Sequence, residues 1–83
     1  MDYRLTLDSD AFEFFQTLRP EKRRKILDKI RQLKAAPFSE GQWRTQEPTG
    51  RALEVSVVDD LSIYHWTDHL GKMVYVTRLE KLT

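Results

Sequence analysis

Two segments in the C-terminal half of the chain alternate with a period of two, and a third is largely apolar; these patterns constrain the fold most. In residues 51–58, every second residue from Leu53 to Val57 is apolar. In residues 61–67, Leu61, Ile63 and His65 alternate with Ser62, Tyr64 and Trp66, and residues 73–79 are a largely apolar segment. A period of two is typical of β-strands with one buried face. The sequence therefore predicts three strands here.

Short polar segments separate these three strands. Asp59-Asp60 lies between the first and the second, and a pair of this kind favours a tight turn. Residues 68–72, "DHLGK", contain Gly71 and predict the next turn. Strands joined by connections this short pair antiparallel. We therefore expect these strands to belong to a largely antiparallel sheet.

The N-terminal end of the chain predicts one strand and one helix. Residues 3–7 alternate as a half-buried strand does. Asp8 or Ser9 can then cap a helix, because its side-chain oxygen can accept from the free amides of the first turn. Apolar residues recur at helical spacing as far as Leu18. We expect a short amphipathic helix over residues 9–18.

A second helix is predicted from Pro20 to just before Pro37. Proline is tolerated in the first helical turn but not in the interior, so it marks both limits. The helix has an apolar stripe made of Ile26, Leu27, Ile30 and Leu33. Residues 37–50 are polar and rich in turn formers, and we expect a loop there. The predicted order is βααβββ: an α+β fold, with a two-helix hairpin packed on one face of a mostly antiparallel four-stranded sheet.

Length and composition predict one domain spanning residues 1–83. No cysteine is present, which excludes disulfides and thiolate metal sites. No apolar run approaches the roughly 20 residues of a membrane span. We therefore expect a cytoplasmic protein without a membrane partner. Fourteen basic and 13 acidic residues nearly cancel, which argues against a strongly cationic nucleic-acid binder.

The order and spacing of these segments resemble the RelE/ParE toxin superfamily of bacterial toxin–antitoxin modules. The resemblance covers nearly the whole chain, from a first strand that opens with Tyr3 to the closing strand "KMVYVTRLEK". In between, the helix that ends at Pro37 is followed by a loop containing Gly41. The segment "LEVSVVDDLSIYHW" then stands where the family has its central hairpin, commonly aromatic-E-L-R-V-G-D-Y-R-I-I-Y.

The resemblance implies a toxin that is neutralised by a cognate antitoxin protein and that acts in growth regulation. RelE-like members cleave mRNA in the ribosome without a metal ion, whereas ParE-like members bind DNA gyrase and block it. The fold alone does not choose between these activities. We expect a RelE-like mRNA endonuclease (an mRNA interferase) with the ribosome and mRNA as partners. The alternatives are a non-catalytic ParE-like toxin acting on gyrase and an inactive member that only binds an antitoxin.

Against the family pattern, the central hairpin has lost its arginines. Glu54 stands at the family glutamate, but Ser56 and Leu61 occupy the two arginine positions. Where many nuclease members carry His-Arg and then a tyrosine, this chain has Glu80-Lys81. Losing such an electrostatic contact typically costs on the order of a hundredfold in rate. An active site, if present, is therefore atypical.

For RNA cleavage we expect a rearranged catalytic set: Arg51, Glu54, Tyr64, His65 and Arg78. His65 has an ordinary pKa of about 6.5, which suits proton transfer, although a packed, hydrogen-bonded histidine is the alternative. Glu54 could act as a base, or could be an exposed glutamate paired with Arg51 or Arg78. Tyr64 could act on RNA, or could pack against cross-strand neighbours. The two arginines could bind phosphate or be solvated.

Basic residues elsewhere predict a second contact with nucleic acid. Lys22, Arg23 and Lys29 lie on the second helix, and Arg44 lies in the loop that follows it. They could contact an RNA or DNA backbone without reading its sequence. A solvated helix surface is the alternative. His69 falls in a predicted turn and, with His65, has no spacing that suggests metal ligation, so we expect neither a metal ion nor a cofactor.

Overall fold

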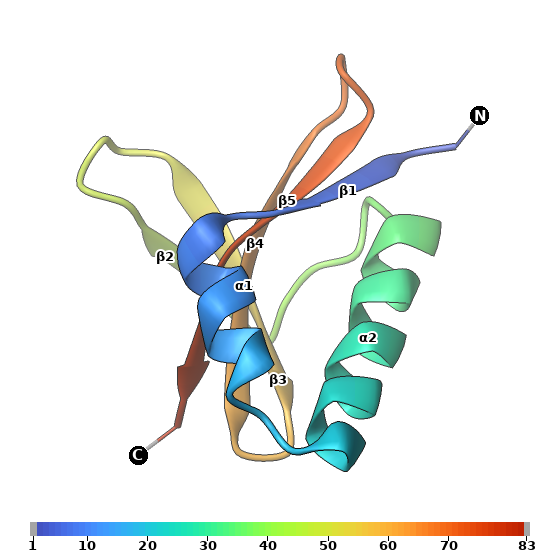
Figure 1. The fold of residues 1–83 in the computed structure, drawn as a ribbon. Helices are drawn as coiled ribbons and strands as arrows, with labels where there is room; N and C mark the ends of the chain where they lie inside the picture. Colours follow the sequence, from blue (N-terminus) through green and yellow to red (C-terminus); the bar gives the residue numbers. More distant parts are fainter. Residues whose placement is uncertain (1, 83) are drawn as a thin grey trace.

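The chain forms two helices and a five-stranded sheet (Figure 1). The computed structural model describes residues 2–82. In chain order its elements are β1 (Arg4–Leu7), α1 (Ser9–Gln16), α2 (Pro20–Ala35), β2 (Trp43–Gln46), β3 (Ala52–Val58), β4 (Leu61–Asp68) and β5 (Met73–Lys81). The predicted α+β class is confirmed. The predicted four-stranded sheet is wrong, because β2 lies in the segment that we expected to be a loop.

The sheet is mixed, with the strand order β1-β5-β4-β3-β2. From β2 to β5 the neighbours pair antiparallel, and the short turns predicted this for β3, β4 and β5. β1 instead pairs parallel with β5, so that Arg4 lies beside Met73 and Leu7 beside Val76. The first strand therefore lies next to the last one (Figure 1).

Both helices begin where the sequence predicted. Asp8 occupies the N-cap position of α1, but its side chain makes no capping hydrogen bond. Pro20 stands in the first turn of α2. α1 ends at Gln16, two residues earlier than predicted, and the Thr17 hydroxyl donates to the carbonyl of Phe14. Within residues 2–82, no helix combines the length and the apolar character needed to cross a membrane.

The core lies between the helices and one face of the sheet. α1 contributes Ala11, and α2 contributes the buried residues Ile26, Ile30 and Leu33. The sheet contributes Leu61, Ile63, Val74, Val76 and Leu79. Paired residues on neighbouring strands share a face, and the register pairs Ile63 with Leu79. The prediction that both helices pack on one face of the sheet is confirmed.

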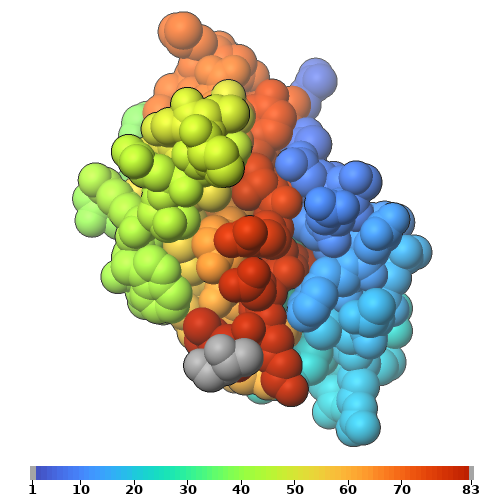
Figure 2. Space-filling model, turned by 90° about the vertical axis from the view of Figure 1, so that its left-hand side faces the viewer, coloured from blue at the N-terminus to red at the C-terminus, as the bar shows by residue number. Residues whose placement is uncertain are grey.

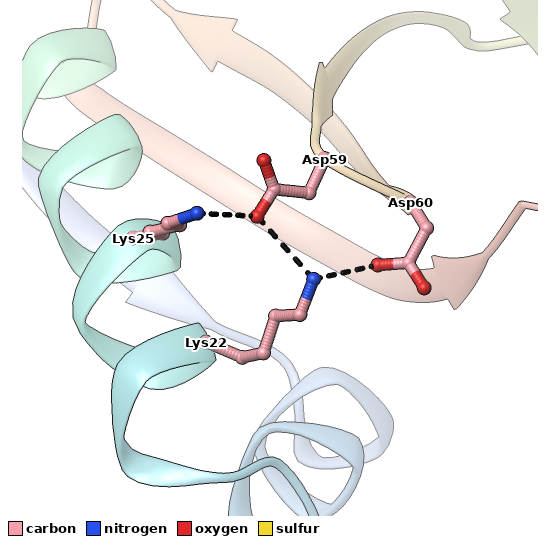
Figure 3. Close-up of polar contacts among 4 residues, drawn as sticks. All are labelled: Lys22, Lys25, Asp59 and Asp60. Carbon is pink, nitrogen blue, oxygen red and sulfur yellow. Dashed lines mark hydrogen bonds and ion pairs between the residues drawn. The ribbon is translucent and has the colours of Figure 1, made fainter.

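The β3–β4 turn is tied to α2 by two lysines, and we call this set of ion pairs the turn clamp (Figure 3). Lys22 Nζ lies 3.3 Å from Asp59 and 3.1 Å from Asp60, and Lys25 Nζ lies 2.8 Å from Asp59. The lysines hold the pKa of both aspartates below its usual range, and the aspartates raise the pKa of Lys22. Asp59 has a φ of 54°, a conformation that aspartate tolerates better than most residues.

The loop between α2 and β2 passes close to β3. Gly41 N donates to Glu54 at 2.7 Å, and Gln42 N donates to the carbonyl of Val55 at 2.8 Å. A Cβ at Gly41 would lie 2.7 Å from the backbone N and C of Val55. Only glycine fits this approach without moving the backbone.

Candidate functional site

The sheet face opposite the helices presents aromatic and cationic side chains. One row across four strands joins Trp43, Val55, Tyr64 and Arg78, which the register pairs in that order. Trp66 and Tyr75 form the next pair. We call this surface the open face and define it by Trp43, Arg51, Tyr64, Trp66, Tyr75, Arg78 and Glu80. The alternation in 61–67 predicted that Tyr64 and Trp66 share a face.

A continuous stack of planar groups occupies one part of the open face. The rings of Trp66 and Tyr75 are stacked, with centroids 4.5 Å apart and planes inclined by 10°. The guanidinium of Arg51 lies 4.0 Å from the centroid of the Trp66 ring. Such a cation–π contact is worth about 0.5–1 kcal/mol at an exposed site. We call these three residues the planar stack.

Beside the planar stack, three residues bring together a phenol, a guanidinium and a carboxylate. The Tyr64 hydroxyl donates to Glu80 at 3.2 Å, and Arg78 Nε lies 3.6 Å from the same carboxylate. The guanidinium of Arg78 also lies 4.2 Å from the centre of the Tyr64 ring. We call Tyr64, Arg78 and Glu80 the polar cluster. It contains a proton acceptor, a proton donor and a fixed positive charge within one small area.

A groove of about 630 Å³ runs along the planar stack. Its walls come from the β2–β3 loop, from β5 and from the residue that precedes α1. It is lined by Asp8, Thr45, Gln46, Glu47, Pro48, Arg51, Leu53, Trp66, Tyr75, Thr77 and Arg78. Figure 2 shows this side of the molecule, with β5 between the β2–β3 segment and the N-terminal β1–α1 segment. The groove is large enough for a small organic group such as a nucleotide.

The structure does not bring the five expected catalytic residues together. Arg51, Tyr64 and Arg78 lie on the open face, whereas Glu54 and His65 pair with each other on the helix-covered face. The sheet separates the two groups. Glu54 and His65 therefore cannot act on a phosphate that is bound by Arg51 or Arg78.

His65 is a packed, hydrogen-bonded residue. It is 3% exposed, and its Nε2 is joined to the Ser56 hydroxyl by a hydrogen bond of 2.8 Å. Burial is the main cause that lowers the pKa of His65; nearby Lys29 lowers it further, and Glu54 opposes them. Glu54 forms an ion pair with Arg44 Nε at 2.6 Å rather than with Arg51 or Arg78.

The basic residues expected to contact nucleic acid do not form one surface with free charges. Lys22 belongs to the turn clamp, and Arg44 is paired with Glu54 and Glu40. Within residues 2–82, Arg23 Nε is buried without a hydrogen-bond partner. Lys29 is partly buried near His65. Ion pairing and burial leave this helix less cationic than its sequence suggests.

The second histidine belongs to an aromatic corner at the β4–β5 turn. His69 is exposed, as expected for a turn, but its Nδ1 is hydrogen-bonded to the Tyr3 hydroxyl at 2.9 Å. Its ring also stacks on Phe38 at 4.2 Å. Across residues 2–82, no three histidine, aspartate or glutamate side chains gather in a way that could hold a metal ion.

Four residues of the open face were not among the expected site residues: Trp43, Trp66, Tyr75 and Glu80. A signal for Trp66 and Glu80 was present in the sequence, because each lies two positions from an expected site residue on the same strand. Tyr75 could not be placed beside Trp66 without the register of β4 and β5. A β-bulge at Tyr64/His65 shifts that register.

This chain is a small α+β protein. Two helices cover one face of its mixed sheet, and the other face presents cationic and aromatic side chains. The fold is that of the RelE toxins. No protein-family model matches the sequence, and no curated protein matches it. The likeness is therefore one of structure, and the expectation of a RelE-type fold is confirmed at that level.

Three solved structures illustrate the likeness. The isolated RelE toxin of E. coli aligns with a TM-score of 0.80 and 17% identity, over 98% of this chain and 85% of the other. RelE in the archaeal RelE–RelB complex from Pyrococcus horikoshii aligns at 0.79 and 15%, over 98% and 96%. The toxin–antitoxin complex RelBE2 from Mycobacterium tuberculosis aligns at 0.79 and 12%, over 98% and 99%.

Proposed function

We propose that this chain is the toxin of a type II toxin–antitoxin module and acts as a RelE-like, ribosome-dependent mRNA endonuclease with an atypical reaction centre. The observation that carries the proposal is the polar cluster of Tyr64, Arg78 and Glu80, placed beside a groove on the open face. The RelE-type fold supports it. The partners of this chain are then an antitoxin protein, the ribosome and mRNA. Two of the similar structures are complexes of a RelE protein with its antitoxin, which supports the first partner.

The chemistry needs three functions, and the polar cluster offers one group for each. Glu80 takes the proton of a ribose 2′-hydroxyl, and the 2′-oxygen attacks the adjacent phosphorus. The guanidinium of Arg78 stabilises the negative charge that develops on the pentavalent phosphate. Tyr64 donates a proton to the departing 5′-oxygen. The bond from phosphorus to the 5′-oxygen breaks, leaving a 2′,3′-cyclic phosphate and a free 5′-hydroxyl.

This proposal replaces the two expected residues that face the helices. Glu80 takes the role of base that we expected for Glu54 or His65, because it contacts both Tyr64 and Arg78. The family arginines missing at Ser56 and Leu61 are replaced by an arginine from the last strand. Ser56 is buried on the helix-covered face and Leu61 belongs to the core, so an arginine at either position would disrupt packing in this chain.

The test is induction of the chain and its variants in cells, with cleavage of translated mRNA mapped by primer extension. Glu80→Gln and Arg78→Gln should each lower cleavage by about a hundredfold, because each removes one group needed in the transition state. Glu13→Gln, on the exposed side of α1, is the matched control and should cleave normally. The cut ends should carry a 2′,3′-cyclic phosphate. A substrate with a 2′-deoxyribose at the cut should be inert.

Two outcomes would overturn the proposal. Growth arrest with intact transcripts would exclude an mRNA endonuclease, and accompanying DNA breaks would identify the ParE-like action on gyrase. Cleavage that is unaffected by Glu80→Gln and Arg78→Gln would exclude the polar cluster as the reaction centre.

A further inference from the structure

We infer that the planar stack of Arg51, Trp66 and Tyr75 is a binding site for one unpaired nucleobase of an RNA strand. This inference deepens the proposed function and rests on it for the choice of RNA as the ligand. It assigns a separate role to each part of the open face. The planar stack holds a base, and the polar cluster holds the neighbouring phosphate.

The geometry of the planar stack suits a flat, uncharged ring. Trp66 and Tyr75 are nearly parallel, and the Arg51 guanidinium continues the stack on the indole. Unpaired bases stack on aromatic rings and on guanidinium planes in the same way. The side chain of Arg51 is exposed and also lines the groove. It can therefore form the end of the stack on which a base lies.

The charged side chains that line the groove favour an uncharged base inside it and a phosphate next to it. Asp8 and Glu47 line the groove together with the planar stack, and carboxylates disfavour a phosphate inside it. An uncharged base with N–H donors is compatible with these acceptors. Arg78, which also lines the groove, belongs to the polar cluster and suits the phosphate. The groove is therefore a site for a base, with an anion site next to it.

The spacing along β4 links the two sites. Tyr64 of the polar cluster and Trp66 of the planar stack are two residues apart and on the same face. That separation is about 7 Å along a strand. A base and a phosphate of the same or adjacent nucleotides can span this distance. The base held by the planar stack is therefore next to the bond that is cut.

The two tryptophans of the chain provide a direct test. Trp43→Phe leaves Trp66 as the only tryptophan, so the fluorescence of this variant reports on the planar stack alone. A short single-stranded RNA should quench it. A strand with the same backbone and abasic residues at every position should bind more weakly and should not quench it. Trp66→Phe leaves only Trp43 and should show little change with either strand.

Variants separate the binding of the base from that of the phosphate. Arg51→Ala removes the end of the stack on which the base lies, so it should weaken RNA binding by about 5- to 100-fold, the effect of losing one stacked base, and should weaken binding of the abasic strand much less. Arg78→Gln should weaken binding of both strands. If Arg51→Ala fails to fold, the quenching measured on the Trp43→Phe variant still decides the question.

The outcomes distinguish this inference from the proposed function. Base-dependent quenching without mRNA cleavage supports the base site and contradicts the endonuclease. Cleavage with no quenching at saturating RNA supports the endonuclease and overturns the base site. Equal binding of the RNA and abasic strands also overturns the base site.

Discussion

His65 couples its protonation state to the packing of the sheet against α2. Burial lowers the pKa of His65 below its ordinary value of 6.5. As the pH falls, the unfolded chain therefore takes up this proton before the folded chain does. The stabilisation associated with the neutral ring is complete above pH 6.5 and is lost as the pH falls below that value.

We predict that the free energy of unfolding declines between pH 6.5 and pH 5 more steeply in the original chain than in a His65→Gln variant. Glutamine does not titrate and can keep a hydrogen bond with Ser56. Urea unfolding at several pH values measures the slope. His69→Gln, which changes the exposed histidine, is the control and should keep the original slope. Equal slopes for the original chain and His65→Gln would show that His65 does not titrate between the two states.

The candidate site was partly predictable at the level of residues. Alternation along β4 placed Tyr64 and Trp66 on one face, and the interpretation of His65 as a packed histidine is confirmed. Residues 51 and 54 differ by an odd number, so alternation along the predicted strand already separates Glu54 from Arg51, but alternation does not say which face the helices cover. That choice depends on the packing of the whole sheet.

At the level of elements, the turn clamp fixes the β3–β4 turn against the start of α2. Two aspartates in a two-residue turn repel each other, and Lys22 and Lys25 compensate for this repulsion (Figure 3). The clamp is exposed, so its contribution to stability is small and sensitive to salt. The lowered pKa of both aspartates means that this contribution is present above pH 3.8 and is lost at more acidic pH.

We predict that Asp59→Asn lowers the melting temperature at low ionic strength and has little effect at about 1 M salt, where the screening length is only about 3 Å. Asparagine tolerates the positive φ of this position, so the change removes charge without straining the turn. Asp28→Asn, which breaks the exposed pair with Arg31, is the control and should have a smaller effect. A loss of stability that is independent of salt would show that the clamp does not act through charge.

The elements that the sequence did not predict are those without a burial pattern. All four residues of β2 are exposed, and the strand forms through its backbone pairing with β3. A pattern of apolar residues cannot indicate such a strand. The parallel pairing of β1 with β5 was also beyond the sequence, because alternation predicts that a strand exists but not which neighbour it chooses.

At the scale of the whole molecule, the net charge is close to neutral, and the cations must therefore act locally. Five basic side chains make seven ion pairs with carboxylates: Lys22, Lys25 and Arg31 on α2, Arg44 on β2, and Arg78 on the open face. Lys22 and Arg44 each contact two acids. Arg51 on the open face instead contacts an aromatic ring. This distribution supports the proposed binding of RNA through the open face.

Four of these five side chains belong to α2 or β2. Their charge is therefore largely matched by neighbouring carboxylates. The exposed guanidinium of Arg51 has no carboxylate partner among residues 2–82, which leaves it available to a nucleic acid.

We predict that the salt dependence of RNA binding follows the open face. Each phosphate contact on a single strand contributes a slope of about 0.7 in a plot of log affinity against log salt concentration. Arg78→Gln, which removes the cation proposed to bind the phosphate, should lower the slope by about that amount. Arg24→Gln and Lys29→Gln, on α2, should leave it unchanged. The opposite result would assign RNA binding to the helix surface that contains Lys22, Arg23 and Lys29.

The parallel pairing of β1 with β5 also determines how late in synthesis the sheet can finish folding. Residues 4–7 find their partners only in residues 73–76, so the first strand to be synthesised must wait for the last. Contacts between such distant parts of a chain form slowly, because a long loop must be closed first. Tyr64, Arg78 and Glu80 come from β4 and β5. The polar cluster can therefore exist only after β4 and β5 have both been synthesised.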